Sequence, residues 1–244
     1  MQAPITDHPV GLLIERLRQF GEYPTGVRAI DDSCRVPGTA FFPAGNGLWD
    51  HAGLLPSLAQ RPLMLLGHNF GDVEAMEEAS NRGMEDLRGP TWRNLLGLLA
   101  EAKVSPSRCF FTNALMGLKD DAGGCVGALS DDCDYRQHCS DFLGYQVEVL
   151  RPGCILALGA DAQEMLVRLN PEIAVAWRGP RGGKKTIKSL FASADRGLIP
   201  SVRFPGSLCC GVAVMYHPCE MRNLRTVWSE TVVLVKTVAA LCGG

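Results

Sequence analysis

Four short, mainly apolar runs stand out along the chain, and none of them alternates regularly with polar positions. They are 63–67 (LMLLG), 108–112 (RCFFT), 154–158 (CILAL) and 212–216 (VAVMY). Runs of this length without alternation are typical of strands that are covered on both faces, as in a parallel sheet. The pattern therefore predicts four strands buried inside an α/β protein.

Apolar positions recur at helical spacing between and around these runs. The stretch 9–20 predicts an amphipathic opening helix, and further helical patterns cover 72–86, 91–102, 138–150 and 227–241. Strands that alternate with helices favour parallel pairing through right-handed crossovers. We therefore expect an α/β fold, a three-layer α/β/α sandwich with a central, mainly parallel four-stranded sheet.

Length and composition fit one such unit. The chain has 244 residues, of which 46% are hydrophobic, enough to bury a full core. We expect residues 1–244 to form a single domain, with 1–60 as an N-terminal extension packed on it. The net charge of −2 provides no overall basic field, so a polyanionic partner would need a local patch.

Targeting and metal signals are weak. The first twenty residues show no basic region followed by an apolar core, and no apolar run is long enough to cross a bilayer. Ten cysteines without an export signal favour reduced thiols, and Cys125, Cys133 and Cys139 lack the paired spacing of a zinc site. We expect a cytoplasmic monomer without membrane contact, metal or cofactor.

Polar residues follow each predicted strand at the point where it ends. The segments are GHNFGD at 67–72, TN at 112–113, GAD at 159–161 and HP at 217–218. Ligands in open α/β sheets bind at the carboxyl ends of the strands. Topology alone therefore predicts that two asparagines and two histidines converge on one rim.

Each of these residues also has a purely structural interpretation. Asn69 and Asn113 could be turn or strand-capping residues, although an amide offers the donor and acceptor that suit the edge of a pyrimidine. His217 precedes a proline, which favours an extended backbone, and it could be a hydrogen-bond donor, a general acid or a packed turn residue.

A basic segment, RGPRGGKKTIK at 178–188, is a further candidate site. It contains Arg181, Lys184 and Lys185 and no acidic residue. A solvated loop explains this composition, and so does contact with nucleic-acid phosphates through the cations and the glycine-rich backbone.

Taken together, these motifs resemble the uracil-DNA glycosylase superfamily over about residues 61–230. GHNFG at 67–71 is similar to the asparagine form of the first motif, as in the mismatch-specific and single-strand-selective branches. CFFTNALMGL at 109–118 resembles the strand leading to a base-reading asparagine, and YHPCEMRN at 216–223 resembles the histidine-proline loop. The stretch 139–162 is similar to a segment of the iron–sulfur branch.

The resemblance implies a mechanism in which the target nucleotide is extruded from the base stack into a pocket. Asn69 would position the attacking water through its side-chain carbonyl. Asn113 would hydrogen-bond the edge of the base. His217 would donate to the carbonyl on which negative charge develops, a contribution of roughly 3 kcal/mol.

Further roles follow from the same resemblance. Gly67, His68 and Phe70 would line the base site, and either Phe70 or Trp92 could stack on the extruded base. For Trp92 the alternative is a core position beneath the following helix. Met221 and Arg222 could fill the gap left in the duplex or contact phosphate.

The chain also departs from the family pattern. Phe70 replaces the usual proline, Gly71 stands where one branch has a tyrosine that blocks thymine, and Glu220 would repel phosphate. Cys139 falls at the last ligand position of the iron–sulfur branch, but Cys34 stands alone where paired ligands are expected, so we predict no cluster.

We therefore predict a monofunctional DNA glycosylase that acts on uracil or a related deaminated base in DNA. Two alternatives remain. One is a catalytically inactive protein of the same fold that binds DNA or a base. The other is an α/β protein that holds a nucleotide phosphate with LALGADA, which lacks the Gly-x-Gly spacing of a dinucleotide fingerprint.

Overall fold

A computed structural model describes residues 8–30, 34–36, 40–49, 58–120, 133–179, 182–183, 185–223 and 225–243. Its main sheet has five strands in the order β3-β2-β5-β7-β6. They are β2 (Leu63–Gly67), β3 (Cys109–Asn113), β5 (Cys154–Leu158), β6 (Ile199–Phe204) and β7 (Leu208–Met215). The first four strands in this order are parallel, and β6 pairs antiparallel with β7 at the edge.

The expected number of four strands was wrong, because β6 was not predicted. The four apolar runs do form β2, β3, β5 and β7, and β2 and β5 have the predicted bounds. In β6 only Val202 and Phe204 are buried, and the strand contains Pro200. A short, half-exposed edge strand with a proline lacks the continuous apolar run that identified the others.

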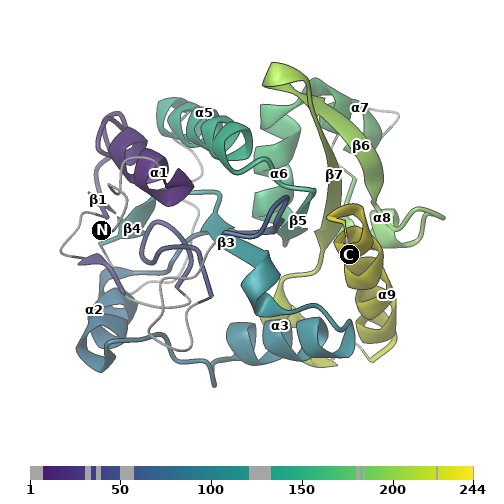
Figure 1. The fold of residues 1–244 in the computed structure, drawn as a ribbon, viewed down its shortest axis with the longest axis horizontal. Helices are drawn as coiled ribbons and strands as arrows, with labels where there is room; N and C mark the ends of the chain where they lie inside the picture. The colour runs from purple at the N-terminus through teal and green to yellow at the C-terminus, as the bar shows by residue number, and fades with distance from the viewer. Residues whose placement is uncertain are drawn as a thin grey trace.

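Helices cover both faces of the sheet and complete the three layers (Figure 1). On one side lie α1 (Pro9–Leu17), α5 (Cys133–Leu150), α6 (Ala160–Leu169) and α7 (Pro171–Trp177), each in contact with the next. On the other side α3 (Pro90–Glu101) packs against α9 (Arg225–Leu241), which contacts β5 and β7. The predicted three-layer α/β/α architecture is confirmed.

The remaining elements are short and lie around this sandwich. They are α2 (Val73–Arg82), α8 (Ile187–Phe191), a two-stranded sheet of β1 (Val27–Ala29) and β4 (Gly117–Lys119), and the 3₁₀ turns η3 (Pro106–Arg108), η4 (Pro205–Ser207) and η5 (Pro218–Asn223). Helix α2 ends four residues before its predicted end, because Gly83 adopts a left-handed conformation with φ 68°. This turn leaves 83–89 as a loop.

Residues 40–49 lie along the outer edge of β3. The Phe42 N–H donates to the Phe111 carbonyl at 3.0 Å, and the Asn113 N–H donates to the Phe42 carbonyl at 3.2 Å. Phe42 is fully buried, and Phe41 and Leu48 belong to the same core. This part of the chain therefore covers the edge of the sheet and supplies core side chains.

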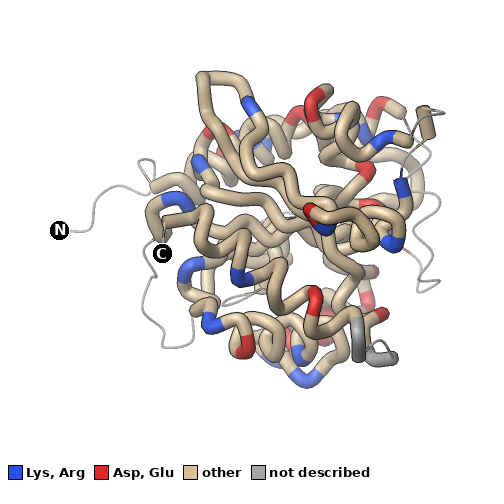
Figure 2. The backbone as a smooth tube through the Cα atoms, turned by 90° about the vertical axis from the view of Figure 1, so that its right-hand side faces the viewer, with Lys and Arg blue, Asp and Glu red and all other residues tan. Residues whose placement is uncertain are grey.

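Basic and acidic residues are interspersed along the chain, as Figure 2 shows. Across the ranges that the structure describes, no helix is both long enough and apolar enough to pass through a lipid bilayer.

Candidate active site

The carboxyl ends of β2, β3, β5 and β7 border one cavity of about 940 Å³. Seven residues singled out from the sequence line it, namely Gly67, His68, Asn69, Phe70, Trp92, Asn113 and His217. They come from segments up to 150 residues apart in the chain, counted from 67 to 217. The four parallel strands bring most of them together because these strands all end on the same side, and Trp92 is added from α3.

The loops that follow β2 and β3 are held side by side. Gly67 is paired with Asn113 in the sheet, and the Ala114 and Leu115 N–H groups donate to the Gly67 and His68 carbonyls, each at 2.9 Å. Within the first loop, Asn69 Nδ2 donates to the Gly71 carbonyl at 3.4 Å. This bond leaves the Asn69 side-chain carbonyl available to accept a hydrogen bond.

Asn113 is the most buried of the predicted polar residues, with 2% of its surface exposed. Its Nδ2 atom is buried and has no hydrogen-bond partner among the described residues. Buried polar groups in folded proteins are nearly always paired, so an unpaired donor beside a cavity indicates a ligand or water that binds there.

His217 lies on a loop fixed by contacts with two other elements. Asn94 on α3 donates to the Pro218 carbonyl at 2.7 Å, and a Cβ atom at Gly159 would be only 3.2 Å from the His217 Cβ. The Cys219 N–H donates to His217 Nδ1 at 3.4 Å, and the Cys219 sulfur is 2.9 Å from the same nitrogen. In the neutral ring, Nε2 therefore carries the proton and can donate it.

The electrostatic environment keeps both histidines of the cavity neutral. Burial lowers the pKa of His217, an effect that Glu220 and Asp161 oppose. Burial also lowers the pKa of His68, whose Nδ1 lies 3.5 Å from the Asp161 carboxylate. Neutral imidazoles at physiological pH can act as hydrogen-bond donors without a permanent positive charge.

Trp92 is a core residue that also lines the cavity. It is 6% exposed, and its ring centroid lies 5.3 Å from both Phe41 and Phe111. The core interpretation of Trp92 therefore holds, and its contact with a base would be limited to the part that borders the cavity. Phe70 is half-buried and packs against a second small cluster that includes Met76 and Leu118.

Sequence reasoning missed several residues of the cavity, among them Phe41, Glu85 and Gln163. Gln163 is fully buried; its Nε2 donates to the Lys185 carbonyl at 2.9 Å, while its Oε1 lacks a partner in the described part of the chain. The aromatic pair at 41–42 was a signal for a core position. Nothing in the sequence distinguishes Glu85 from the acids of α2.

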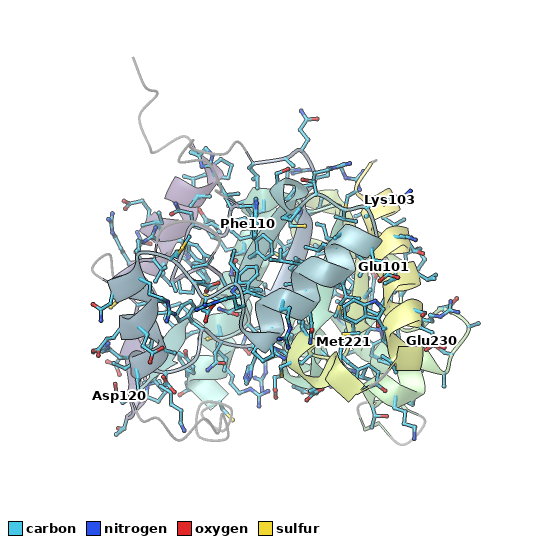
Figure 3. The ribbon with its side chains drawn as sticks, turned by 90° about the horizontal axis from the view of Figure 1, so that it is seen from below. Glu101, Lys103, Phe110, Asp120, Met221 and Glu230 are labelled. Atoms are coloured by element: carbon cyan, nitrogen blue, oxygen red, sulfur yellow. The ribbon has the colours of Figure 1, made fainter. Side chains whose placement is uncertain are left out.

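Of the residues expected to contact DNA, the structure describes the side chains of Met221 and Lys185. Met221 is 3% exposed and packs in the main core where η5 meets α3 (Figure 3), so the expected contact of its side chain with DNA is wrong. Lys185 Nζ donates to the Ala176 carbonyl at 3.0 Å. Arg181 and Lys184 lie outside the described residues, as does the side chain of Arg222.

The cysteines that were considered as metal ligands differ in how deeply they are buried. Cys139 is fully buried in α5, Cys133 is exposed at its start and Cys34 is half-buried, while Cys125 lies outside the described residues. In the part of the chain that the structure describes, no group of three or more histidine, cysteine or acidic side chains is arranged to hold a metal ion.

Comparison with known proteins gives no independent assignment: no protein-family model and no curated protein matches the chain. The resemblance to the uracil-DNA glycosylase superfamily therefore stays a prediction.

Proposed function

We propose that the protein is a monofunctional DNA glycosylase that hydrolyses the N-glycosidic bond of uracil, or of a related deaminated base, in DNA. The observation that carries the proposal is the arrangement of Asn69, Asn113 and His217 around one cavity at the carboxyl end of the sheet. A volume of about 940 Å³ is ample for a nucleotide extruded from the base stack.

Recognition of the base falls to Asn113. Its unpaired Nδ2 can donate to a carbonyl of the base, while Oδ1 can accept from the adjacent ring N–H. The imide edge of uracil offers this acceptor and donor side by side. Cytosine presents an amino group and an unprotonated ring nitrogen instead, so the Asn113 amide would face donor with donor.

Asn69 would place the attacking water. Its amide nitrogen is engaged by the Gly71 carbonyl, so its side-chain oxygen is the atom free to orient a water molecule. The amide is not a strong base, and its contribution is to hold the nucleophile in position. The water oxygen forms the new bond to C1′ of the sugar as the bond from C1′ to the base breaks.

His217 would stabilise the departing base, which takes the electron pair of the broken bond. The neutral ring donates from Nε2 toward the carbonyl where this negative charge accumulates. A preorganised donor of this kind contributes roughly 3 kcal/mol to the transition state. The base anion then takes a proton, and a water proton is released to solvent.

The test is base release from oligonucleotides that contain one uracil, either single-stranded or in a G·U pair, followed by alkali to break the abasic site. We expect release by the wild-type protein and strong losses in Asn69→Ala and His217→Ala. Asn81→Ala, on the exposed surface of α2, is the matched control. Absence of release from both substrates would contradict the proposal.

Lys188 makes a second readout necessary. This exposed lysine lines the cavity, and a lysine there could attack C1′ and form an imine. Strand breaks that arise without alkali and disappear in Lys188→Ala would replace the monofunctional mechanism with a bifunctional one.

A second candidate function is binding of DNA or a base without hydrolysis. Besides Glu85, three acidic residues, Asp86, Asp161 and Glu220, line the same cavity and would repel phosphate. This function predicts that the protein retains uracil-containing DNA, more weakly as salt increases, and releases no base.

A further inference from the structure

Glu85 is a cavity residue that belongs to none of the sequence motifs. It lies in the loop between α2 and α3 and borders the same cavity as Asn69, Asn113 and His217. Its Oε2 atom is buried and finds no hydrogen-bond partner within the described ranges. A buried carboxyl oxygen without a partner next to a cavity is unusual, and it points to a group that enters the cavity.

Phe41 connects Glu85 with Asn113. The Phe41 ring and Asn113 Oδ1 both approach the same point, the position of a Cβ atom on Gly67, at 3.3 and 2.6 Å respectively. The backbone of Phe41 and the side chain of Trp92 lie close enough to the Glu85 carboxyl group to lower its pKa. Phe41 therefore borders both residues, through its ring beside Asn113 and through its backbone beside Glu85.

We propose that Glu85 is a specificity-determining residue of this site, donating a hydrogen bond from its carboxyl group to a second acceptor on the base that Asn113 holds. The proposal rests on the proposed function, whose substrate recognition it extends. A protonated carboxyl has one donor and one acceptor, so it can complement a carbonyl oxygen or an unprotonated ring nitrogen. The base would supply the partner that Oε2 lacks.

The protonation state of Glu85 agrees with this role. Burial raises the pKa of its carboxyl from 4.5 to about 8, although hydrogen bonds to Trp92 and to the Phe41 backbone oppose the shift. The group is therefore mostly protonated at neutral pH. A carboxylate in the same place would repel the negative charge that develops on the departing base.

Other titratable and charged groups border the same cavity. Arg82 and Asp86 lie on either side of Glu85 in the chain, and the other walls carry His68, Asp161, Lys188, His217, Cys219 and Glu220. The two histidines have pKa values lowered from 6.5, whereas burial raises the pKa of Cys219 above 9.0. A change in the rate of base release near pH 8 can thus be distinguished from changes caused by titration of the histidines or the thiol.

The experiment measures single-turnover release of uracil between about pH 6 and about pH 10 for three variants. Glu85→Gln keeps a donor at every pH, Glu85→Leu removes it, and Glu77→Gln is a matched control on the exposed surface of α2. Circular dichroism and thermal unfolding establish that each variant is folded. Binding of free uracil, followed by its NMR line broadening, gives a readout that needs no catalysis.

We expect wild-type release to fall as the pH rises through about 8, and this fall to be absent in Glu85→Gln. Deprotonation of the substrate affects both proteins equally, so their ratio isolates the carboxyl group. Glu85→Leu should release uracil roughly ten- to a hundredfold more slowly at neutral pH, the loss expected for a buried hydrogen bond. It should bind free uracil more weakly, and Glu77→Gln should match the wild type.

Three results would overturn the proposal. A rate that rises through pH 8 and is lost in Glu85→Gln would make Glu85 a general base instead. Release and uracil binding that are unchanged in Glu85→Leu would remove its role and leave the proposed glycosylase standing. If the wild type neither releases nor binds uracil, both the role of Glu85 and the proposed glycosylase are refuted. If uracil binding depends on Glu85 but no base is released, the role of Glu85 is supported and only the hydrolysis is refuted.

Discussion

The Oδ1 atom of Asn113 lies 2.6 Å from the point that a Cβ atom would occupy on Gly67. The two residues are partners in the pairing of β2 with β3, so their backbones cannot move apart without disrupting the sheet. Glycine at 67 thus creates the space in which the Asn113 amide reaches the cavity. Packing at Gly67, in the GHNFG motif, therefore fixes the position of the Asn113 side chain in the second motif.

Gly67→Ala should therefore impair base release by displacing the Asn113 side chain. A methyl group at this position also comes within 3.3 Å of the Phe41 ring, so the amide has little room to adjust. We expect a loss of roughly a hundredfold in release, the effect of an ångström-scale misplacement, and overpacking that costs about 1–3 kcal/mol of stability. Base-release kinetics and urea unfolding measure the two effects.

Asn81→Ala, on the exposed surface of α2, is the control for this variant. Wild-type release in Gly67→Ala would show that Asn113 does not need its present position.

His217→Ala should lower the rate constant for base release by roughly a hundred- to a thousandfold, as does loss of one donor to a developing anion. His217→Gln should retain part of the activity, because its amide can donate toward the same region. Substrate binding should change little, since the interaction strengthens only as charge develops. Single-turnover kinetics with a filter-binding measurement separate the two effects; a His217→Ala variant that loses binding alone would contradict this role.

The buried histidines should make the protein less stable in acid. Burial lowers the pKa of His68 and of His217 from the unfolded value of 6.5, so their stabilisation is present above pH 6.5. It is lost as the pH falls from 6.5 through the lower folded values, because the unfolded chain binds the protons more readily. Each histidine contributes a slope of at most about 1.4 kcal/mol per pH unit.

Urea unfolding at a series of pH values between about 5 and about 8 tests this dependence. The difference in stability between the wild type and a His68→Gln, His217→Gln double variant should shrink toward acid. A difference that stays constant with pH would rule out a role for these two rings.

Glu85 should have the opposite effect. The pKa of its carboxyl is raised from 4.5 to about 8 by burial, so its contribution to stability is present below pH 4.5 and is lost as the pH rises through 8. Glu85→Gln should become progressively more stable than the wild type between these values, by up to about 1.4 kcal/mol per pH unit. Urea unfolding of both proteins measures this gain.

Glu77→Gln, which alters an exposed carboxyl on α2, should show no such gain relative to the wild type. Equal pH profiles for Glu85→Gln and Glu77→Gln would mean that Glu85 is ionised in the folded protein at neutral pH.

Much of the fold follows from local patterns. The uninterrupted apolar runs identified β2, β3, β5 and β7, because a strand covered on both faces needs apolar residues at every position. Helical spacing located α3 and α9 to within two residues. The edge strand β6 and the short helices α7 and α8 were not predicted, because each buries only part of its surface.

The candidate site, like the fold, could be predicted from the sequence only in part. Asn69, Asn113 and His217 could be named in advance because each lies at the end of a strand or within two residues of it, and parallel strands end on one side of the sheet. Met221 was misjudged, because its position after the histidine suggested exposure while packing against α3 buries it. Glu85 could not be selected, since Gly83 ends the preceding helix earlier than the periodicity indicated.

By itself the sequence determined which segments form the buried strands and which polar groups stand at their ends, since both depend on neighbours in the chain. Tertiary structure alone decided that 40–49 covers the edge of β3, that Phe41 and Glu85 enter the cavity, and that Asn113 fits only beside a glycine. These outcomes depend on packing between segments distant in sequence. The burial that sets the pKa values of Glu85 and the two histidines has the same origin, because it exists only after the layers have assembled.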